Sequence, residues 1–168
     1  MKIRKTQAED LDIVLEIYAH ARDLMRETGN PTQWGDTWPP VDLIQSDIQQ
    51  QKSYVCVKDI EEKAGQAEEI LAVFFLEVAE DPTYAEIYDG SWLEVNRPYG
   101  VVHRIASLGQ GAGGFCLEWA LAECGNIRID THEANLPMRS LLKKLGYTYC
   151  GMIYTHDGTP RLAYQKTR

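Results

Sequence analysis

The sequence predicts one mixed α/β domain, of the α+β kind, with a mostly antiparallel central sheet flanked by helices. Amphipathic helical segments alternate with short apolar strands. Several of the strands follow one another closely enough to form antiparallel hairpins. The chain has 168 residues, which suits a single domain with one hydrophobic core. No internal repeat, low-complexity segment or long linker divides it, so we expect one domain over residues 1–168.

The N-terminal elements are a strand and a helix. Residues 2–5 read as a short strand. Between residues 11 and 25, apolar side chains recur at intervals of three and four, which predicts an amphipathic helix that ends near Gly29. Thr6, with Glu9 three positions later, resembles a capping box at the start of this helix.

The remaining elements follow from the same two periodicities. A loop rich in proline and tryptophan precedes a second short helix over residues 41–50. Residues 53–58 and 70–77 read as a hairpin whose turn is the charged segment 61–69. After segment 81–98, which has no clear periodicity, the pattern predicts a strand at 99–107, a helix from 115, a strand at 126–131, a helix at 136–145, and two closing strands at 147–154 and 160–165.

Composition excludes several classes of function. The net charge of −8 comes from 17 basic and 25 acidic residues and disfavours nucleic acid as a partner. The chain has no apolar run long enough to span a membrane, and its N-terminus lacks the apolar core of a signal peptide. We therefore expect a cytoplasmic protein with no membrane partner. His132 and Glu133 begin a zinc-protease motif, but Leu136 replaces its second histidine, so we expect no metal.

A glycine-rich turn between a strand and a helix is the sharpest motif. Glycines at positions 109, 111, 113 and 114 interrupt apolar sequence where the helix begins. Glycine lets the backbone approach a ligand closely, and the first turn of a helix offers unpaired N–H groups and a partial positive charge. Together these properties predict a phosphate-binding turn.

The sequence allows three other interpretations of this turn. It lacks the Gly-Lys-Ser/Thr ending of a nucleoside-triphosphate-binding loop. A dinucleotide-binding fingerprint is suggested by Asp130, nineteen residues after Gly111, but the preceding strands do not form repeated βα units. The turn can also be a plain flexible connection, although four glycines exceed what a connection needs.

The motifs resemble those of the GNAT superfamily, the GCN5-related N-acetyltransferases. Gln110-Gly111-Ala112-Gly113 matches the core of the family's Arg/Gln-x-x-Gly-x-Gly/Ala loop. Segment 127–154, IRIDTHEANLPMRSLLKKLGYTYCGMIY, looks like the family's fifth strand, asparagine-bearing helix, Leu-Gly-Tyr turn and sixth strand. The resemblance covers residues 99–166 well and residues 1–78 more weakly. It implies a sheet in which the fourth and fifth strands part to hold CoA.

The resemblance implies a site for acetyl-CoA as co-substrate, without a metal. Main-chain groups of 105–107 would pair with the pantetheine arm, and amides from 109 to 114 would bind the diphosphate. Asn135 would bond to the arm, and Arg139, Lys143 or Lys144 would meet the adenosine phosphates unless they form a solvated helix face. The cofactor-binding residues expected on this basis are Ile105, Ala106, Ser107, Gly109, Gln110, Gly111, Ala112, Gly113, Gly114, Asn135 and Lys143.

Two departures from the family pattern affect the expected activity. Leu108 occupies the first position of the loop motif, where Arg or Gln is usual. Leu142 occupies the position of the tyrosine that protonates the leaving thiolate in many members. The expected reaction is direct transfer of an acetyl group from acetyl-CoA to a primary amine of a small molecule, amino acid or peptide. The alternatives are a non-catalytic acyl-CoA-binding module, which Leu142 favours, and a pure scaffold.

The residues that act on the acceptor are less sharply defined. His103, on the strand before the glycine turn, is the first candidate for the base, and Glu77 is the second; His103 can equally be structural. Strict alternation would put His103 and Arg104 on opposite faces of the strand. The aromatic residues Trp34, Trp38 and Trp92 either line the acceptor pocket or anchor loops to the core. A homodimer is also compatible with the sequence.

Overall fold

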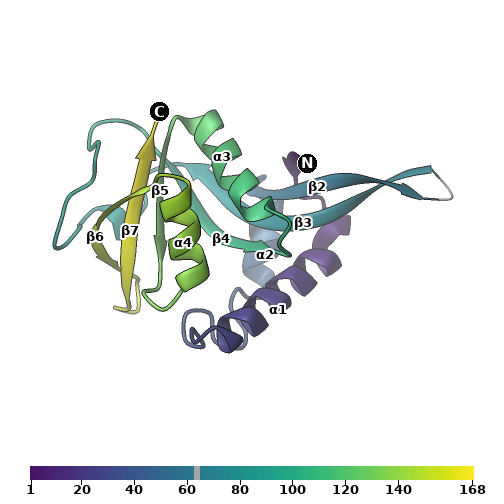
Figure 1. Cartoon of the computed structure of the whole chain (residues 1–168), viewed down its shortest axis with the longest axis horizontal. Coiled ribbons are helices and arrows are strands. Elements are labelled where there is room, and N and C mark those ends of the chain that lie inside the picture. Colours follow the sequence, from purple (N-terminus) through teal and green to yellow (C-terminus); the bar gives the residue numbers. More distant parts are fainter. Residues whose placement is uncertain (63–64) are drawn as a thin grey trace.

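The computed structural model describes residues 1–62 and 65–168 and has the predicted order of strands and helices (Figure 1). The turn expected within 61–69 includes residues 63–64, which lie outside the described residues. The elements are β1 (Lys2–Lys5), η1 (Ala8–Asp10), α1 (Leu11–Glu27), α2 (Val41–Gln49), β2 (Ser53–Glu62), β3 (Gly65–Val78), η2 (Pro82–Tyr84), β4 (Gly100–Ser107), α3 (Ala112–Cys124), β5 (Asn126–Thr131), α4 (Leu136–Lys144), β6 (Thr148–Tyr154) and β7 (Pro160–Thr167).

The strands of the described residues form one mixed, mostly antiparallel sheet. Its order is β1-β2-β3-β4-β5-β7-β6. Every neighbouring pair is antiparallel except β4 and β5, which run parallel. The α/β class expected from the sequence is therefore confirmed. The antiparallel strands before the glycine turn also disagree with a dinucleotide-binding fold, which needs successive parallel βα units.

Helices cover both faces of this sheet. Figure 1 shows α3 and α4 on one face, with α1 and the fainter α2 on the other side. The first face buries Leu117 and Leu121 of α3 and Leu142 of α4 against the strands. On the second face, α1 and α2 pack on β2 and β3, while segment 84–99 covers β4, β6 and β7 through Tyr84, Trp92 and Tyr99.

The parallel strands β4 and β5 part soon after they meet. They pair only at Gly100 with Ile127 and at Val101 with Arg128, although β4 continues to Ser107. Beyond this point the edge of β4 that faces β5 has no strand partner among the described residues. An extended backbone edge of this kind leaves main-chain N–H and C=O groups open to a ligand.

A bulge in β4 marks the place where the strands separate. Val73 pairs with Ala106, but Phe75 pairs with His103, so β4 contains one extra residue there. Arg104 lies in the bulge, and its φ of 49° is in the left-handed region. The expectation of a regular strand is thus wrong: the bulge turns the backbone so that His103 and Arg104 both line one cavity.

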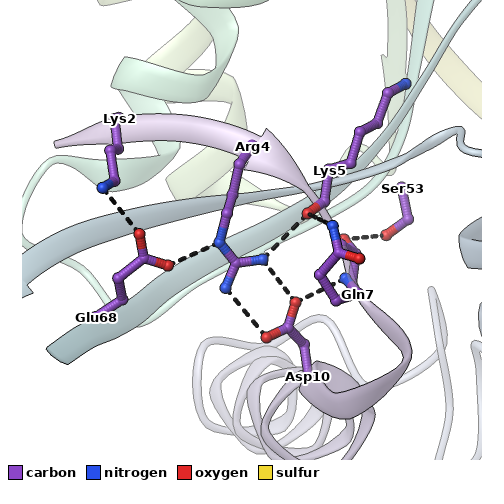
Figure 2. A network of polar contacts seen from close by, with 8 residues as sticks. Lys2, Arg4, Lys5, Gln7, Asp10, Ser53 and Glu68 are labelled. Atoms are coloured by element: carbon purple, nitrogen blue, oxygen red, sulfur yellow. Dashed lines mark hydrogen bonds and ion pairs between the residues drawn. The ribbon is translucent and has the colours of Figure 1, made fainter.

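An ion-pair network fastens β1 to the start of α1 (Figure 2). Arg4 donates two hydrogen bonds to Asp10, at 2.7 and 3.1 Å, and a third from Nε to Glu68 at 2.8 Å. Asp10 also accepts from the main-chain N–H of Gln7. The capping box expected from Thr6 does not form, because its hydroxyl bonds instead to Ser53 at 2.7 Å.

Candidate functional site

The glycine turn that leads into α3 has an unusual backbone conformation. Gly109, Gln110 and Gly111 have φ angles of 96°, 55° and 78°, so three consecutive residues adopt the left-handed region. A β-carbon at Gly109 or Gly111 would meet no atom within 4 Å, so no neighbouring side chain closes the turn. Successive left-handed residues before a helix form a concave set of donors suited to an anion.

Most amides of this turn lack an internal partner. The N–H of Gly109 donates to Ser107 Oγ at 3.0 Å, and that of Ala112 donates to Gly109 O at 3.0 Å. Among the described residues, no hydrogen bond accepts the N–H groups of Gln110, Gly111, Gly113 and Gly114. They lie just before and within the first turn of α3, a helix whose dipole adds partial positive charge there.

The fold itself does not require glycine at positions 113 and 114. A β-carbon at Gly113 would lie 3.6 Å from Leu141 and 3.7 Å from Ser107, and at Gly114 it would lie 3.6 Å from Leu141. These are ordinary contacts, so alanine fits. Glycine inside a helix costs about 0.5–1 kcal/mol relative to alanine. Two such residues in the first turn are best explained by a ligand that approaches the main chain closely.

A cavity of about 750 Å³ lies where β4 and β5 part. Its wall comes from the α1–α2 loop, β4, segment 81–83, β5, the start of α4 and the β6–β7 turn. Ile105 on the open edge of β4 and His103 before the bulge contribute to the same wall. The cavity therefore connects the open strand edge with a group of ionisable side chains.

His103 stands between two aspartates in this cavity. Its Nε2 lies 2.7 Å from Asp81 Oδ2, and its Nδ1 lies 3.9 Å from Asp130 Oδ2. The other oxygen of Asp81 accepts from both the N–H and the hydroxyl of Thr83. The Tyr84 hydroxyl donates to Asp130 at 2.6 Å. Both carboxylates beside His103 are thus themselves fixed by hydrogen bonds.

The protonation states of two neighbours follow from their surroundings. Burial alone raises the pKa of Asp81, but hydrogen bonds from His103 and Thr83 outweigh it and lower that pKa to about 2. Burial, followed by the Asp130 carboxylate, raises the pKa of Tyr84 well above its ordinary value. Asp81 is therefore an anion at neutral pH that only accepts hydrogen bonds, and the Tyr84 hydroxyl remains a donor.

Acid should destabilise the wild-type protein more than an Asp81→Asn variant. The folded-state pKa of Asp81 is depressed, so its stabilisation is present above the unfolded-state value and is lost between about pH 4 and pH 2. After allowance for partial solvent screening, we expect the free energy of unfolding to fall by about 1–2 kcal/mol more in the wild type. Urea unfolding at stepped pH measures this difference; parallel curves for the two proteins would contradict it.

The residues predicted to contact pantetheine lie on β4 and at the start of α4. Ile105 lines the cavity, whereas the Ala106 side chain is buried toward α1 and α2. Asn135 also lines the cavity and caps α4 by accepting from the N–H of Met138 at 3.2 Å. Its Nδ2 donates to Gln33 Oε1 at 3.0 Å, which leaves one N–H of the amide for a ligand. Gln33 is a member of the site that the sequence did not indicate.

Lys143 does not lie with the glycine turn. It contributes to a separate hollow between α4 and the last strands, together with Arg139 and Tyr149. Leu141, two positions before it, is the α4 residue that faces Gly113 and Gly114. Because residues two apart on a helix point in different directions, Lys143 faces away from the turn, and the expected contact with CoA phosphates has no support in the structure.

Glu77 is also remote from the cavity wall. It lies near the end of β3, and its carboxylate pairs with Lys52 at 2.8 Å. The register places Glu77 opposite Val101, before β4 and β5 part. Glu77 therefore forms a surface ion pair. Of the two candidate bases, only His103 lines the cavity.

The three tryptophans considered for the acceptor pocket divide into two groups. Trp34 and Trp38 line the cavity, and Trp34 packs edge-on against Tyr18 at 5.8 Å between ring centres. Trp92 is buried instead in the core beneath segment 84–99, where its indole N–H donates to Tyr84 O at 3.0 Å. Its ring packs against the Arg128 guanidinium at 4.3 Å. Trp92 is therefore an anchor of this segment and not part of the cavity wall.

Asp81, Asp130 and Arg161 are cavity residues that sequence reasoning missed as members of a site. In the sequence, Asp130 stands out only by its spacing from Gly111, although an acid within an apolar strand is a usable signal. Asp81 and Arg161 lie at the ends of elements, and only the folded chain brings them near His103. Within residues 1–62 and 65–168, no cluster of metal-binding side chains and no helix long and apolar enough to cross a membrane occurs.

Comparison with solved structures reveals close similarity over the whole chain. An acetyltransferase of the GNAT family from Streptococcus agalactiae 2603 is 30% identical, with a TM-score of 0.84, and the match covers 99% of this chain and 95% of that protein. A GNAT acetyltransferase from Listeria monocytogenes 4b F2365 is 17% identical, with a TM-score of 0.66, over 99% of this chain and 94% of that one.

A third structure in this comparison was solved with acetyl-CoA. It is the GNAT superfamily phosphinothricin acetyltransferase from Sinorhizobium meliloti, 14% identical with a TM-score of 0.61, and the match covers 99% of this chain and 87% of that one. No sequence-family model and no curated protein matches the chain. The identity and coverage of the streptococcal match, together with the parted strands and the glycine turn, show that the chain belongs to the GNAT family of acetyltransferases.

Proposed function

We propose that this protein is an acetyl-CoA-dependent N-acetyltransferase that acts on a primary amine of a small molecule, amino acid or peptide. The observation that supports this most is the continuity of the cavity. Its wall includes both Ile105, on the open edge of β4, and the His103–Asp81 pair. One compartment thus joins a binding edge for the acyl carrier to a group able to accept a proton.

The residues present fit acetyl-CoA as co-substrate, which supplies the activated thioester. The unpaired amides of Gln110, Gly111, Gly113 and Gly114 bind the diphosphate, and the open edge at 105–107 pairs with the pantetheine amides. Asn135 donates its remaining side-chain N–H to the pantetheine arm. Residues 105–114 contain no arginine or lysine. Main-chain donors and the α3 dipole therefore bind the diphosphate.

His103 is the residue that removes the proton from the acceptor amine. Asp81 is ionised and can only accept, so Nε2 of His103 donates to it, which leaves Nδ1 as the ring nitrogen able to accept a proton. Nδ1 faces Asp130 across 3.9 Å. A protonated amine that enters between them is attracted by the Asp130 carboxylate and transfers its proton to Nδ1, which leaves the free amine ready to attack.

The main-chain N–H of Ile105 is the candidate donor to the thioester carbonyl oxygen. It lies at the bulge beside His103, where β4 has no partner on the β5 side. A fixed donor at this place stabilises the negative charge that develops on the oxygen during attack. Leu142 is fully buried in the core, so this helix position provides no proton for the leaving thiolate.

Two measurements on the intact protein test the proposal. Calorimetric titration with CoA should give a Kd of about 1–100 µM, within the range in which enzymes commonly bind substrates. A thiol-release assay with acetyl-CoA and a panel of amines, polyamines, amino acids and peptides should show release that depends on the amine. Binding without release by any amine would identify a binding module, and failure to bind CoA would reject the proposal.

A further inference from the structure

The charged side chains of the cavity are not all satisfied within the protein. Most have strong internal partners. Arg104 donates to both oxygens of Asp47 at 2.9 and 3.0 Å. Asp81 accepts from His103 and Thr83, and the exposed Asp157 accepts from Thr155 and Thr159. Among the described residues, apart from the exposed Asp157, Arg161 and Asp130 are the two charged cavity residues without a hydrogen bond that joins an acidic to a basic side chain.

Arg161 is a buried cation without a carboxylate partner. Its relative exposure is 9%, and it lines the cavity from the start of β7. Its Nη1 donates to the neighbouring Pro160 O at 3.1 Å, and within the described part of the chain no carboxylate lies at ion-pair distance. Burial lowers its pKa, while the more distant Asp130 and Asp157 oppose that shift. A buried guanidinium in this condition has donors to spare for an anion.

Asp130 provides the opposite charge on the same wall. One of its oxygens accepts from Tyr84, and no hydrogen bond to its other oxygen occurs among the described residues. Asp130 lies directly opposite Ala163 in the sheet, and Arg161 is two residues from Ala163 on the same face of β7. The two residues therefore lie on one face of adjacent strands, offset along the strand direction by the rise of two residues, roughly 7 Å.

We infer that the acceptor is a small amine that also bears a carboxylate, with its ammonium between Asp130 and His103 and its carboxylate on Arg161. This inference rests on the proposed function and narrows its substrate to free amino acids and related zwitterions. Acceptor molecules that carry only one of these two kinds of charge fit less well. A polyamine would leave Arg161 unpaired and repelled, whereas a carboxylic acid without an amine would leave Asp130 unpaired and offer no nucleophile.

The test compares amines that differ only in the carboxylate. The common L-amino acids, β-alanine and γ-aminobutyrate are assayed beside their carboxamides and decarboxylated amines, by thiol release from acetyl-CoA. For the best acceptor, the acid should exceed its carboxamide in kcat/KM by about 10- to 100-fold, the range expected from charged hydrogen bonds. In Arg161→Gln this ratio should fall to about 1, while kcat/KM for the carboxamide stays within about threefold; Arg161→Lys should recover part of the ratio.

Arg97→Gln is the matched control, because Arg97 is a surface arginine that pairs with Glu94 outside the cavity. It should keep the wild-type ratio. Acetylation of carboxamides or polyamines as fast as of acids, or a ratio unchanged by Arg161→Gln, would overturn the inference and leave the proposed function intact. If no amine is acetylated, calorimetric titration of the same acids and carboxamides into wild type and Arg161→Gln decides: binding of acids that requires Arg161 supports the site, and equal or absent binding rejects it.

Discussion

Replacement of both Gly113 and Gly114 by alanine is expected to stabilise the protein and to weaken its binding of CoA. Each methyl group makes only ordinary contacts with Leu141 or Ser107, so the fold accepts it. Alanine is the better helix former, and the pair should raise the free energy of unfolding by about 1–2 kcal/mol. The same methyl groups stand beside amides assigned to the diphosphate, and the Kd for CoA should rise about 10- to 100-fold.

Urea denaturation and calorimetric titration with CoA measure the two effects on one protein sample. Ala122→Gly is the matched control, because Ala122 is an exposed residue of the same helix, away from the turn. It should lower the free energy of unfolding by about 1 kcal/mol and leave the Kd for CoA unchanged. If the double alanine variant binds CoA as tightly as wild type, the turn is not the diphosphate site.

The order of elements could be predicted because local patterns determine it. The interval of three and four in α1 and the alternation in β5 depend on neighbours within a few residues. The glycine turn was predicted for a similar reason, since its composition alone limits the conformations that the main chain can adopt. These parts of the prediction survive because tertiary packing has little influence on them.

The arrangement around His103 could not be predicted from local patterns. Its two acidic neighbours come from positions 22 residues before it and 27 residues after it, and neither spacing has a periodic meaning. The bulge at Arg104 depends on the register between β3 and β4, which is a property of the sheet. A strict alternation rule therefore assigned His103 and Arg104 to opposite faces when both line the cavity.

Side chains that look alike in the sequence have different surroundings in the folded protein. Trp34 and Trp92 are both aromatic residues in irregular segments, yet Trp34 lines the cavity while Trp92 packs on Arg128 in the core. The composition of a loop shows that its aromatic residues will be partly buried, but only the packing of segment 84–99 on β4 and β7 decides which of them meet the ligand.

His103→Gln should reduce kcat for amine acetylation by about 100- to 1000-fold at neutral pH, the usual contribution of a positioned general base. Glutamine keeps an N–H₂ group that can donate to Asp81 but has no basic nitrogen in place of Nδ1. The variant should retain the wild-type Kd for CoA, because His103 is not among the residues assigned to the diphosphate or the pantetheine arm. Steady-state kinetics and calorimetry measure both quantities.

The pH dependence separates a base from a merely structural histidine. Without an internal base, only the fraction of acceptor that is already deprotonated can react, so the kcat/KM of His103→Gln should keep rising with pH and approach the wild-type value as the amine loses its proton. His156→Gln, which alters an exposed histidine of the same cavity, should retain the wild-type profile. A His103→Gln enzyme that is slow by a constant factor at every pH would mean that His103 supports the cavity and that another group accepts the proton.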